Sequence, residues 1–322
     1  MRRALLIVFS LFLLLPTGHA SARAPQGQEV SRTGLAGTYL APHEPGPHKG
    51  VLIIAGSGPA DRNGNSKLGV SAGSLKLLAE AFAASNIASL RYDKRGVGSS
   101  QGAAVAESDL RLSTFVNDAR GWNAWLRKQI NIACVFLLGH SEGGLIATRV
   151  AGSSPPAGLM LIAAPGRTFG AVLADQLRRA PMPANERSDA LAILEGLEAG
   201  RETRDVDPKL RNLFRPSVQP YLRSLVNVDP AALLAALPVP TLVVSGGQDL
   251  QVGEADFKAL IRARTDLSTL RIPNMNHVLK DVSGDRAANL ASYRNPDLPL
   301  SPELAAAVTR FVGNTPCPAG KR

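Results

Sequence analysis

Cysteine is scarce in this chain of 322 residues. Only Cys134 and Cys317 are present, and their spacing does not suggest a metal site. Cys134 falls in an apolar run that is expected to be buried, whereas Cys317 lies in a proline-rich tail. A disulfide is possible in an oxidising compartment, but these different settings lead us to expect that the two do not pair.

Long apolar runs and nucleic-acid-binding patterns are also missing. Beyond the N-terminal residues, no stretch reaches the length of about 20 apolar residues that a membrane span requires. No run of Lys and Arg is interleaved with aromatic residues, and no internal repeat is present. We therefore expect neither a nucleic-acid partner nor stable insertion into a membrane.

The first 22 residues have the three parts of a secretory signal peptide. Arg2 and Arg3 precede the apolar run 4–15, and small residues follow at 20–22. We expect cleavage after Ala22 and a secreted or periplasmic protein; a retained N-terminal anchor is the alternative. This segment holds two Arg residues and no acidic residue, so its removal lowers the formal charge from +10 to +8. A basic surface suits anionic envelopes or acidic substrates, but it says more about solubility than about function.

Strand and helix patterns alternate through most of the chain. Short apolar runs predict buried strands, and amphipathic stretches between them predict helices. This alternation predicts an α/β fold with a mostly parallel central sheet flanked by helices, with edge strands over 30–40. In such a sheet, functional groups gather at the carboxyl ends of the strands. The expected strands are 51–55, 87–90, 132–138, 159–163, 240–245 and 268–272, and the expected helices are 74–85, 112–128, 145–151, 254–263 and 302–312.

One segment interrupts this alternation. Residues 167–237 have helical patterns, many charged residues and several prolines, but no convincing strand. We expect a helical cap over the strand ends, since such insertions often line pockets; a helical appendage far from the site is the alternative. The core would then comprise residues 23–166 and 238–314, with a flexible tail over 315–322. The long connection 278–300 is a second candidate for a lid.

A Gly-x-Ser-x-Gly turn joins an expected strand to an expected helix at Gly139, Ser141 and Gly143. This pattern predicts a nucleophile elbow, in which a tight, strained turn lifts the serine hydroxyl above the sheet. The start of the following helix would stabilise negative charge beside Ser141. Such turns also occur without catalysis, so a base and an acid must be found. His140 is next to the serine, and we expect the turn to direct its ring away.

His277 is the remaining downstream histidine, in a loop after the strand 268–272. Asp249 follows the strand 240–245, and therefore lies at the same edge of the sheet. Together with Ser141 they have the order serine, acid, histidine, which is that of the α/β hydrolases. Asp249 could be only a turn residue. Asp256 is the second candidate for the acid, although it falls within a helix.

Two backbone N–H groups are expected to form an oxyanion hole. One belongs to Glu142, directly after the serine. The other belongs to the Gly-rich loop after the strand 51–55, where we assign Ser57, with Gly58 as the alternative.

The sequence resembles the bacterial α/β-hydrolase superfamily, in particular secreted members similar to esterases and often labelled serine-aminopeptidase-like. The resemblance covers residues 49–312 apart from the variable cap. It implies that Asp61 and Arg62 brace the oxyanion loop, and that Asp93 and Arg95 brace the neighbouring loop. The matching motifs are Gly56-Ser57-Gly58-Pro59-Ala60-Asp61-Arg62, Arg91-Tyr92-Asp93-Lys94-Arg95-Gly96-Val97-Gly98, Gly139-His140-Ser141-Glu142-Gly143-Gly144, Gly247-Gln248-Asp249-Leu250-Gln251-Val252 and Asn276-His277.

These residues predict a serine hydrolase, a carboxylesterase that cleaves small to medium acyl esters without a metal or an organic cofactor. An aminopeptidase, an amidase or an acyltransferase could use the same acyl-enzyme chemistry. A non-enzymatic binding protein on the same fold is a third reading, because fold alone does not fix function.

Overall fold

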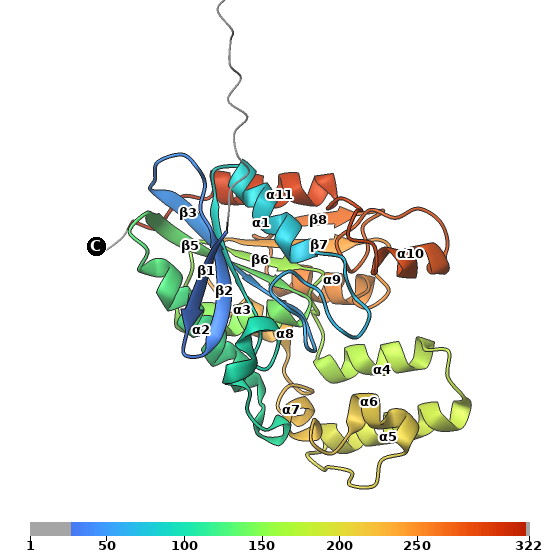
Figure 1. Cartoon of the computed structure of the whole chain (residues 1–322). Helices are drawn as coiled ribbons and strands as arrows, with labels where there is room; N and C mark the ends of the chain where they lie inside the picture. The colour runs from blue at the N-terminus through green and yellow to red at the C-terminus, as the bar shows by residue number, and fades with distance from the viewer. Residues whose placement is uncertain (1–26, 320–322) are drawn as a thin grey trace, which may run out of the picture.

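An eight-stranded sheet forms the centre of the computed structural model, which describes residues 27–319 (Figure 1). The expected signal peptide, residues 1–22, lies outside the described residues. The spatial order of the strands is β1-β2-β4-β3-β5-β6-β7-β8. The strands are β1 (Gln28–Arg32), β2 (Leu35–Leu40), β3 (His48–Ile54), β4 (Ala88–Tyr92), β5 (Ile132–His140), β6 (Leu159–Ile162), β7 (Thr241–Gly246) and β8 (Ser268–Ile272).

The sheet is mostly parallel. Strands β4, β3, β5, β6, β7 and β8 pair in parallel, whereas β1 and β2 form an antiparallel hairpin that adds antiparallel to β4. The central strands are apolar on both faces, as expected where helices cover both sides of a sheet. The predicted α/β class is confirmed, and the carboxyl ends of β3, β5, β7 and β8 lie at one edge.

Helices cover both faces of the sheet (Figure 1). Apolar side chains of α1 and α11 pack on one face, and those of α2, α3, α8 and α9 pack on the other. No helix within residues 27–319 combines the length and the apolar character needed to cross a bilayer. The helices are α1 (Ser74–Ala84), α2 (Leu112–Arg127), α3 (Glu142–Ser153), α4 (Phe169–Arg179), α5 (Ala184–Glu198), α6 (Arg211–Phe214), α7 (Gln219–Arg223), α8 (Pro230–Ala235), α9 (Glu254–Ala263), α10 (Arg286–Ser292) and α11 (Pro302–Asn314), with short 3-10 turns at Gly98–Ala103, Glu107–Asp109 and Pro208–Leu210.

The insertion after β6 forms a helical unit with a core of its own. Helices α4 to α7 and the 3-10 turn Pro208–Leu210 between α5 and α6 bury side chains against one another, including Leu194, Phe214 and Leu222. Figure 1 shows this unit set off from the sheet, next to the loops at the strand ends. Helix α8 differs, because its Leu234 packs in the same cluster as α2 and α3. The separate unit therefore ends before α8, and not at residue 237.

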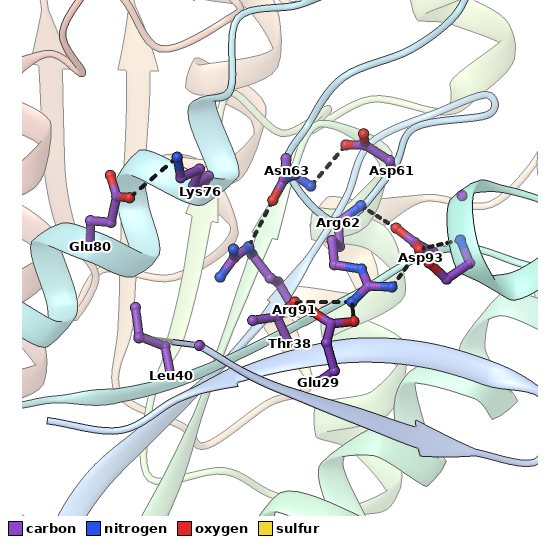
Figure 2. A pocket seen from close by; sticks show the side chains of 13 residues that line it. Glu29, Thr38, Leu40, Asp61, Arg62, Asn63, Lys76, Glu80, Arg91 and Asp93 are labelled. Carbon is purple, nitrogen blue, oxygen red and sulfur yellow. Dashed lines mark hydrogen bonds and ion pairs between the residues drawn. The ribbon is translucent and has the colours of Figure 1, made fainter. Parts of the chain in front are cut away.

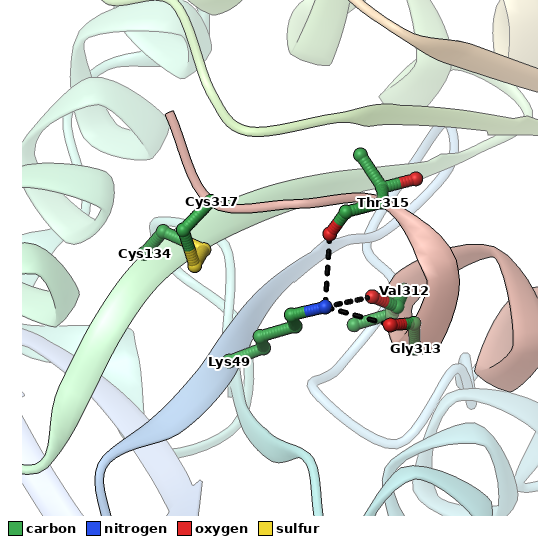
Figure 3. Close-up of a disulfide and its surroundings, with 6 residues drawn as sticks. All are labelled: Lys49, Cys134, Val312, Gly313, Thr315 and Cys317. Atoms are coloured by element: carbon green, nitrogen blue, oxygen red, sulfur yellow. Dashed lines mark hydrogen bonds between the residues drawn. A yellow bond between two sulfur atoms is a disulfide. The ribbon is translucent and has the colours of Figure 1, made fainter. Parts of the chain in front are cut away.

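Cys134 and Cys317 form a disulfide, so the expectation that they do not pair is wrong (Figure 3). Their Cα atoms are 5.6 Å apart although 183 positions separate them in the sequence. Helix α11 packs on the sheet and ends near the beginning of β5, which brings the tail to Cys134. Residues 315–319 are therefore tied to the core at Cys317 rather than loose.

Lys49 at the start of β3 holds the same tail by hydrogen bonds. Its ammonium donates to the carbonyl oxygens of Val312, Gly313 and Thr315 over 2.8 to 2.9 Å (Figure 3). A cation at the carboxyl end of a helix satisfies carbonyls that have no partner within the helix and complements the helix dipole. The end of α11 is thus fixed by both a covalent bond and a charged side chain.

Candidate active site

Ser141 occupies a strained turn between β5 and α3. Its backbone has φ 55° and ψ −128°, a conformation that non-glycine residues rarely adopt and that is found where a function requires it. The flanking glycines make the turn possible, because a Cβ atom on Gly139 would lie 2.2 Å from the carbonyl oxygen of Gly143. A Cβ atom on Gly143 would lie 2.2 Å from the carbonyl oxygen of Ile54. The local sequence therefore sets the geometry of the serine.

Asp249 and His277 form a buried pair. His277 Nδ1 is 2.8 Å from Asp249 Oδ2, and side-chain exposure is 6% for the histidine and 1% for the aspartate. The second oxygen, Oδ1, accepts hydrogen bonds from the N–H groups of Gln251 and Val252. Because a carboxylate oxygen only accepts, Nδ1 is the nitrogen that donates in this pair, and Nε2 is the ring nitrogen that does not contact Asp249.

Ser141 and His277 line one cavity of about 140 Å³ together with Ser57. The carboxylate of Asp249 contacts His277 Nδ1, and the side chain of Glu142, the residue after the serine, is buried. None of the side chains described as lining this cavity comes from residues 167–237. Its other walls are Ala55, Gly56, Ala60, Gly64, Ser66, Val70, Ser74, Leu75, His140, Gln251, Val278 and Tyr293.

The expected direction of the His140 ring is wrong. The rings of His140 and His277 have centroids 4.9 Å apart, and His140 lines the cavity. His140 Nε2 lies 2.8 Å from the carbonyl oxygen of His277 and must donate, since a carbonyl only accepts. Burial lowers the pKa of His140 to about 4. At neutral pH, His140 is thus an uncharged donor that holds the His277 backbone.

Asp256, the second candidate for the acid, is engaged elsewhere. It is fully buried in α9 and accepts hydrogen bonds from the N–H groups of Gly166 and Arg167. The Arg167 guanidinium also pairs with it, with Nη2 2.9 Å from Oδ2. Asp256 therefore anchors the chain where it leaves the core for the insertion, and Asp249 is the carboxylate that contacts His277.

The loops after β3 and β4 are joined by Arg62 and Asp93. Arg62 donates through its backbone N–H, 2.7 Å from Asp93 Oδ1, and through its guanidinium, 2.8 Å from Oδ2. Figure 2 shows this guanidinium between Asp93 and Glu29 of β1. Burial acts to raise the pKa of Asp93, but hydrogen bonds from Arg62 and the Ser99 N–H outweigh it and lower the pKa. The pair thus joins the expected oxyanion loop to the neighbouring loop as a charged unit.

Asp61 and Arg95 have separate partners. Asp61 Oδ1 accepts from the backbone N–H groups of Asn63 and Asn65, which closes a turn in the loop after β3. The Arg95 guanidinium forms two hydrogen bonds of 2.6 and 2.7 Å with Asp118 of α2. Each residue therefore fixes its own loop.

Helix α10, which the sequence patterns did not predict, braces the loops that carry Asp249 and His277. Buried Asn276, next to His277, donates to Asn289 Oδ1 over 3.0 Å. Asn289 in turn donates to the carbonyl oxygen of Gln248, next to Asp249, over 2.8 Å. The available signal was Asp285, whose side chain caps the helix by accepting from the Ala288 N–H. The connection 278–300 is therefore a support for the site and also supplies Val278 and Tyr293 to the cavity wall.

The side chain of Glu142 has contacts that sequence patterns did not reveal. This side chain is 1% exposed, and its carboxylate accepts from the hydroxyls of Ser57 (2.9 Å) and Tyr221 (2.6 Å). Lys94 Nζ lies 3.7 Å from Glu142 Oε1. These residues are far apart in the sequence, and their spacing does not predict that they lie together. Within residues 27–319, no group of three or more His, Cys, Asp or Glu side chains is arranged to hold a metal ion.

Known proteins share parts of this sequence. Residues 67–184, which include Ser141 but not Asp249 or His277, match the family model described as serine aminopeptidase, S33. Esterase EstD of Thermotoga maritima is 27% identical over 278 residues, which cover 83% of this chain. The chain spans 62% of the length of that curated relative.

Solved structures share the fold at low sequence identity. Est1E from Butyrivibrio proteoclasticus, in a complex with ferulic acid, has a TM-score of 0.57 and 15% identity, covering 89% of this chain and 98% of its own. Proline iminopeptidase from Mycobacterium smegmatis has a TM-score of 0.56 and 16% identity, with 89% and 98% covered. Sheet order, helical layers and these likenesses lead to one conclusion: this chain has the α/β-hydrolase fold.

Proposed function

We propose that this protein is a serine hydrolase, a carboxylesterase that cleaves esters of short acyl groups. The observation that carries the proposal is that Ser141, on a strained turn, lines the same cavity as His277, whose Nδ1 is held by Asp249. The esterase among the relatives supports it.

The mechanism uses the described groups without any cofactor. Ser141 attacks the ester carbonyl, and His277 Nε2 accepts its proton and then delivers it to the leaving alcohol. Asp249 keeps the proton of His277 on Nδ1 and stabilises the imidazolium. The N–H groups of Ser57 and Glu142 stabilise the oxyanion. Water then attacks the acyl-enzyme with His277 again as base, which releases the acid.

The cavity favours a small, uncharged acyl group. A volume near 140 Å³ is about that of a cavity that holds benzene, so acyl chains of roughly six carbons or fewer should fit. Val70, Leu75 and Val278 supply apolar walls. No carboxylate side chain is found among the described residues that line it, so a free amino group would lack a charge partner there.

An aminopeptidase is the second candidate, because the matched family model carries that description. It needs a negative group near the substrate amine, and the cavity walls favour neutral esters instead. Amidase and acyltransferase activities would use the same acyl-enzyme, and they remain alternatives within the same proposal.

We also propose that the protein is secreted or periplasmic. The pattern of residues 1–22 supports this, and so does the disulfide between Cys134 and Cys317, since such bonds persist mainly in oxidising compartments.

The test is hydrolysis of p-nitrophenyl esters from acetyl to dodecanoyl, beside aminoacyl p-nitroanilides, by the mature protein. We expect the highest kcat/KM at six carbons or fewer. Ser141→Ala should lower it at least about a thousandfold, because the nucleophile is lost. Ser268→Ala, on the exposed edge strand β8, is the matched control and should match the wild type. Dominant anilide turnover would move the assignment to a peptidase, and turnover that survives Ser141→Ala would refute the mechanism.

A further inference from the structure

A buried ion pair that the hydrolytic mechanism does not use lies directly behind the expected oxyanion hole. The side chains of Lys94 and Glu142 are only 5% and 1% exposed, and Nζ is 3.7 Å from Oε1. Burying two charges costs desolvation energy that their attraction often only balances. Attraction between the two charges alone therefore does not explain the pair, and the other contacts of Lys94 and Glu142 indicate its role.

Lys94 holds one end of the peptide group that carries the expected oxyanion donor. Its ammonium donates a hydrogen bond to the carbonyl oxygen of Gly56. That carbonyl and the N–H of Ser57 belong to the same trans peptide, in which they point in opposite directions. Fixing the carbonyl towards Lys94 therefore fixes the Ser57 N–H on the other side. Within residues 27–319, this N–H donates to no backbone carbonyl.

Two groups near Lys94, Phe115 and Glu142, stabilise a charged ammonium, whereas its burial opposes one. Its Nζ lies 5.1 Å from the centroid of the Phe115 ring, within the range of a cation–π contact. Burial lowers the pKa of Lys94, and the negative charge of Glu142, 3.7 Å away, opposes that shift only in part. A cation on the carbonyl oxygen also polarises the peptide, which makes the Ser57 N–H a stronger donor.

Glu142 contacts the same loop through the side chain of Ser57. Its Oε2 accepts from the Ser57 hydroxyl, and its Oε1 accepts from Tyr221 of α7, in the insertion. Gly56 packs against the serine, since a Cβ atom there would lie 2.9 Å from Ser141 Cβ. The residues that carry the two expected oxyanion donors, Ser57 and Glu142, are thus bonded directly to each other through their side chains.

We propose that the Lys94–Glu142 pair positions the oxyanion hole, by orienting the Gly56–Ser57 peptide and by joining Ser57 to the start of α3. The proposal rests on the proposed function. It makes Lys94 a positioning residue: it acts through a peptide group and does not contact the substrate. Lys94 also offsets the negative charge of Glu142, which would otherwise oppose an oxyanion formed close to it.

The test compares Lys94→Met with Lys49→Met. Both replacements remove an ammonium that donates to backbone carbonyls, but Lys49 lies at the opposite end of β3 from the site. With p-nitrophenyl acetate, Lys94→Met should lower kcat by about ten- to a hundredfold with little change in KM, somewhat less than the loss of an oxyanion donor itself. Lys49→Met should keep the wild-type kcat.

A second readout separates positioning from general damage. A small alkyl trifluoromethyl ketone forms an adduct with Ser141 that carries an oxyanion, so its affinity should fall in proportion to kcat/KM in Lys94→Met. Ser57→Ala keeps the backbone N–H and removes only the hydroxyl that donates to Glu142. Ser57 lies on an exposed loop, so this variant should fold. We expect it to lower kcat in the same way, but less.

The outcomes separate this proposal from the proposed function. An active wild type with unchanged kcat in Ser57→Ala, or in a folded Lys94→Met, would overturn the positioning role and leave the esterase assignment intact. Losses in kcat without a matching loss of ketone affinity would also overturn it. A wild type without serine-dependent turnover would overturn both.

Discussion

Loss of the Cys134–Cys317 disulfide should destabilise the protein far more than it affects catalysis. The bond joins residues separated by 183 positions, so it restricts a large part of the unfolded chain. The chain-entropy relation gives on the order of 5 kcal/mol at 25 °C for a loop of this length. Measured effects are usually smaller than this relation predicts, so we expect the free energy of unfolding to fall by about 2 to 5 kcal/mol.

Urea unfolding, followed by circular dichroism, measures this change. The double variant Cys134→Ala/Cys317→Ala and the wild type reduced with dithiothreitol should unfold at the same lower urea concentration. Hydrolysis of p-nitrophenyl acetate by the folded variant at 25 °C should match the wild type, because Cys134 lies near the start of β5 and Ser141 follows its end. Lys49→Met in the same background should destabilise further, since the tail would then lose its remaining tie.

Two results would refute this reasoning. One is a loss below about 1 kcal/mol, which would mean that the bond does not restrict the unfolded chain as the loop length requires. The other is titration of two free thiols in wild-type protein purified from an oxidising compartment without reductant.

Three further variants test other contacts by urea unfolding. His140→Gln should remove the part of acid destabilisation that arises because the wild-type His140 pKa falls from 6.5 to about 4 on folding. This contribution is absent above pH 6.5, grows as the pH falls, and reaches up to about 3 kcal/mol near pH 4. The same pH dependence of the free energy of unfolding in His140→Gln and the wild type would contradict it. Gly143→Ala should prevent stable folding, since its Cβ atom would meet a carbonyl oxygen at 2.2 Å, whereas Gly102→Ala, with nothing within 4 Å, should fold normally. Tyr221→Phe should cost about 1 to 3 kcal/mol by leaving buried Glu142 with one hydroxyl donor fewer, and an unchanged midpoint would count against that contact.

Local sequence patterns were sufficient to predict the strands and helices around Ser141 and the turn that carries it. The alternation of short apolar runs and amphipathic stretches gave the order of strands and helices, because side-chain periodicity depends on neighbouring residues. The glycines around Ser141 likewise determine its turn, since they act through contacts within a few residues and the adjacent strand. The meeting of Asp249 and His277 followed from one general rule, that parallel strands end at a common edge.

Other features depended on how distant segments pack. The pairing of Cys134 with Cys317, the ion pair of Lys94 with Glu142, and the place of His140 against His277 join residues whose separation in the chain says nothing of their distance in space. The walls of the cavity are decided in the same way: among the described residues they come from the loop after β3, from α1 and from loops after β5, β7 and β8, and none comes from residues 167–237.

The sequence by itself therefore determined the fold class, the turn that holds Ser141, and the edge of the sheet where Asp249 and His277 meet. Their chemical roles stay a proposal. Only the tertiary structure decided what surrounds these residues: the buried charges next to Ser57, the helix that braces the loops of Asp249 and His277, and the size of the cavity. The physical reason is that periodicity and turn chemistry are local, whereas burial, charge pairing and cavity shape depend on the packing of segments far apart in the chain.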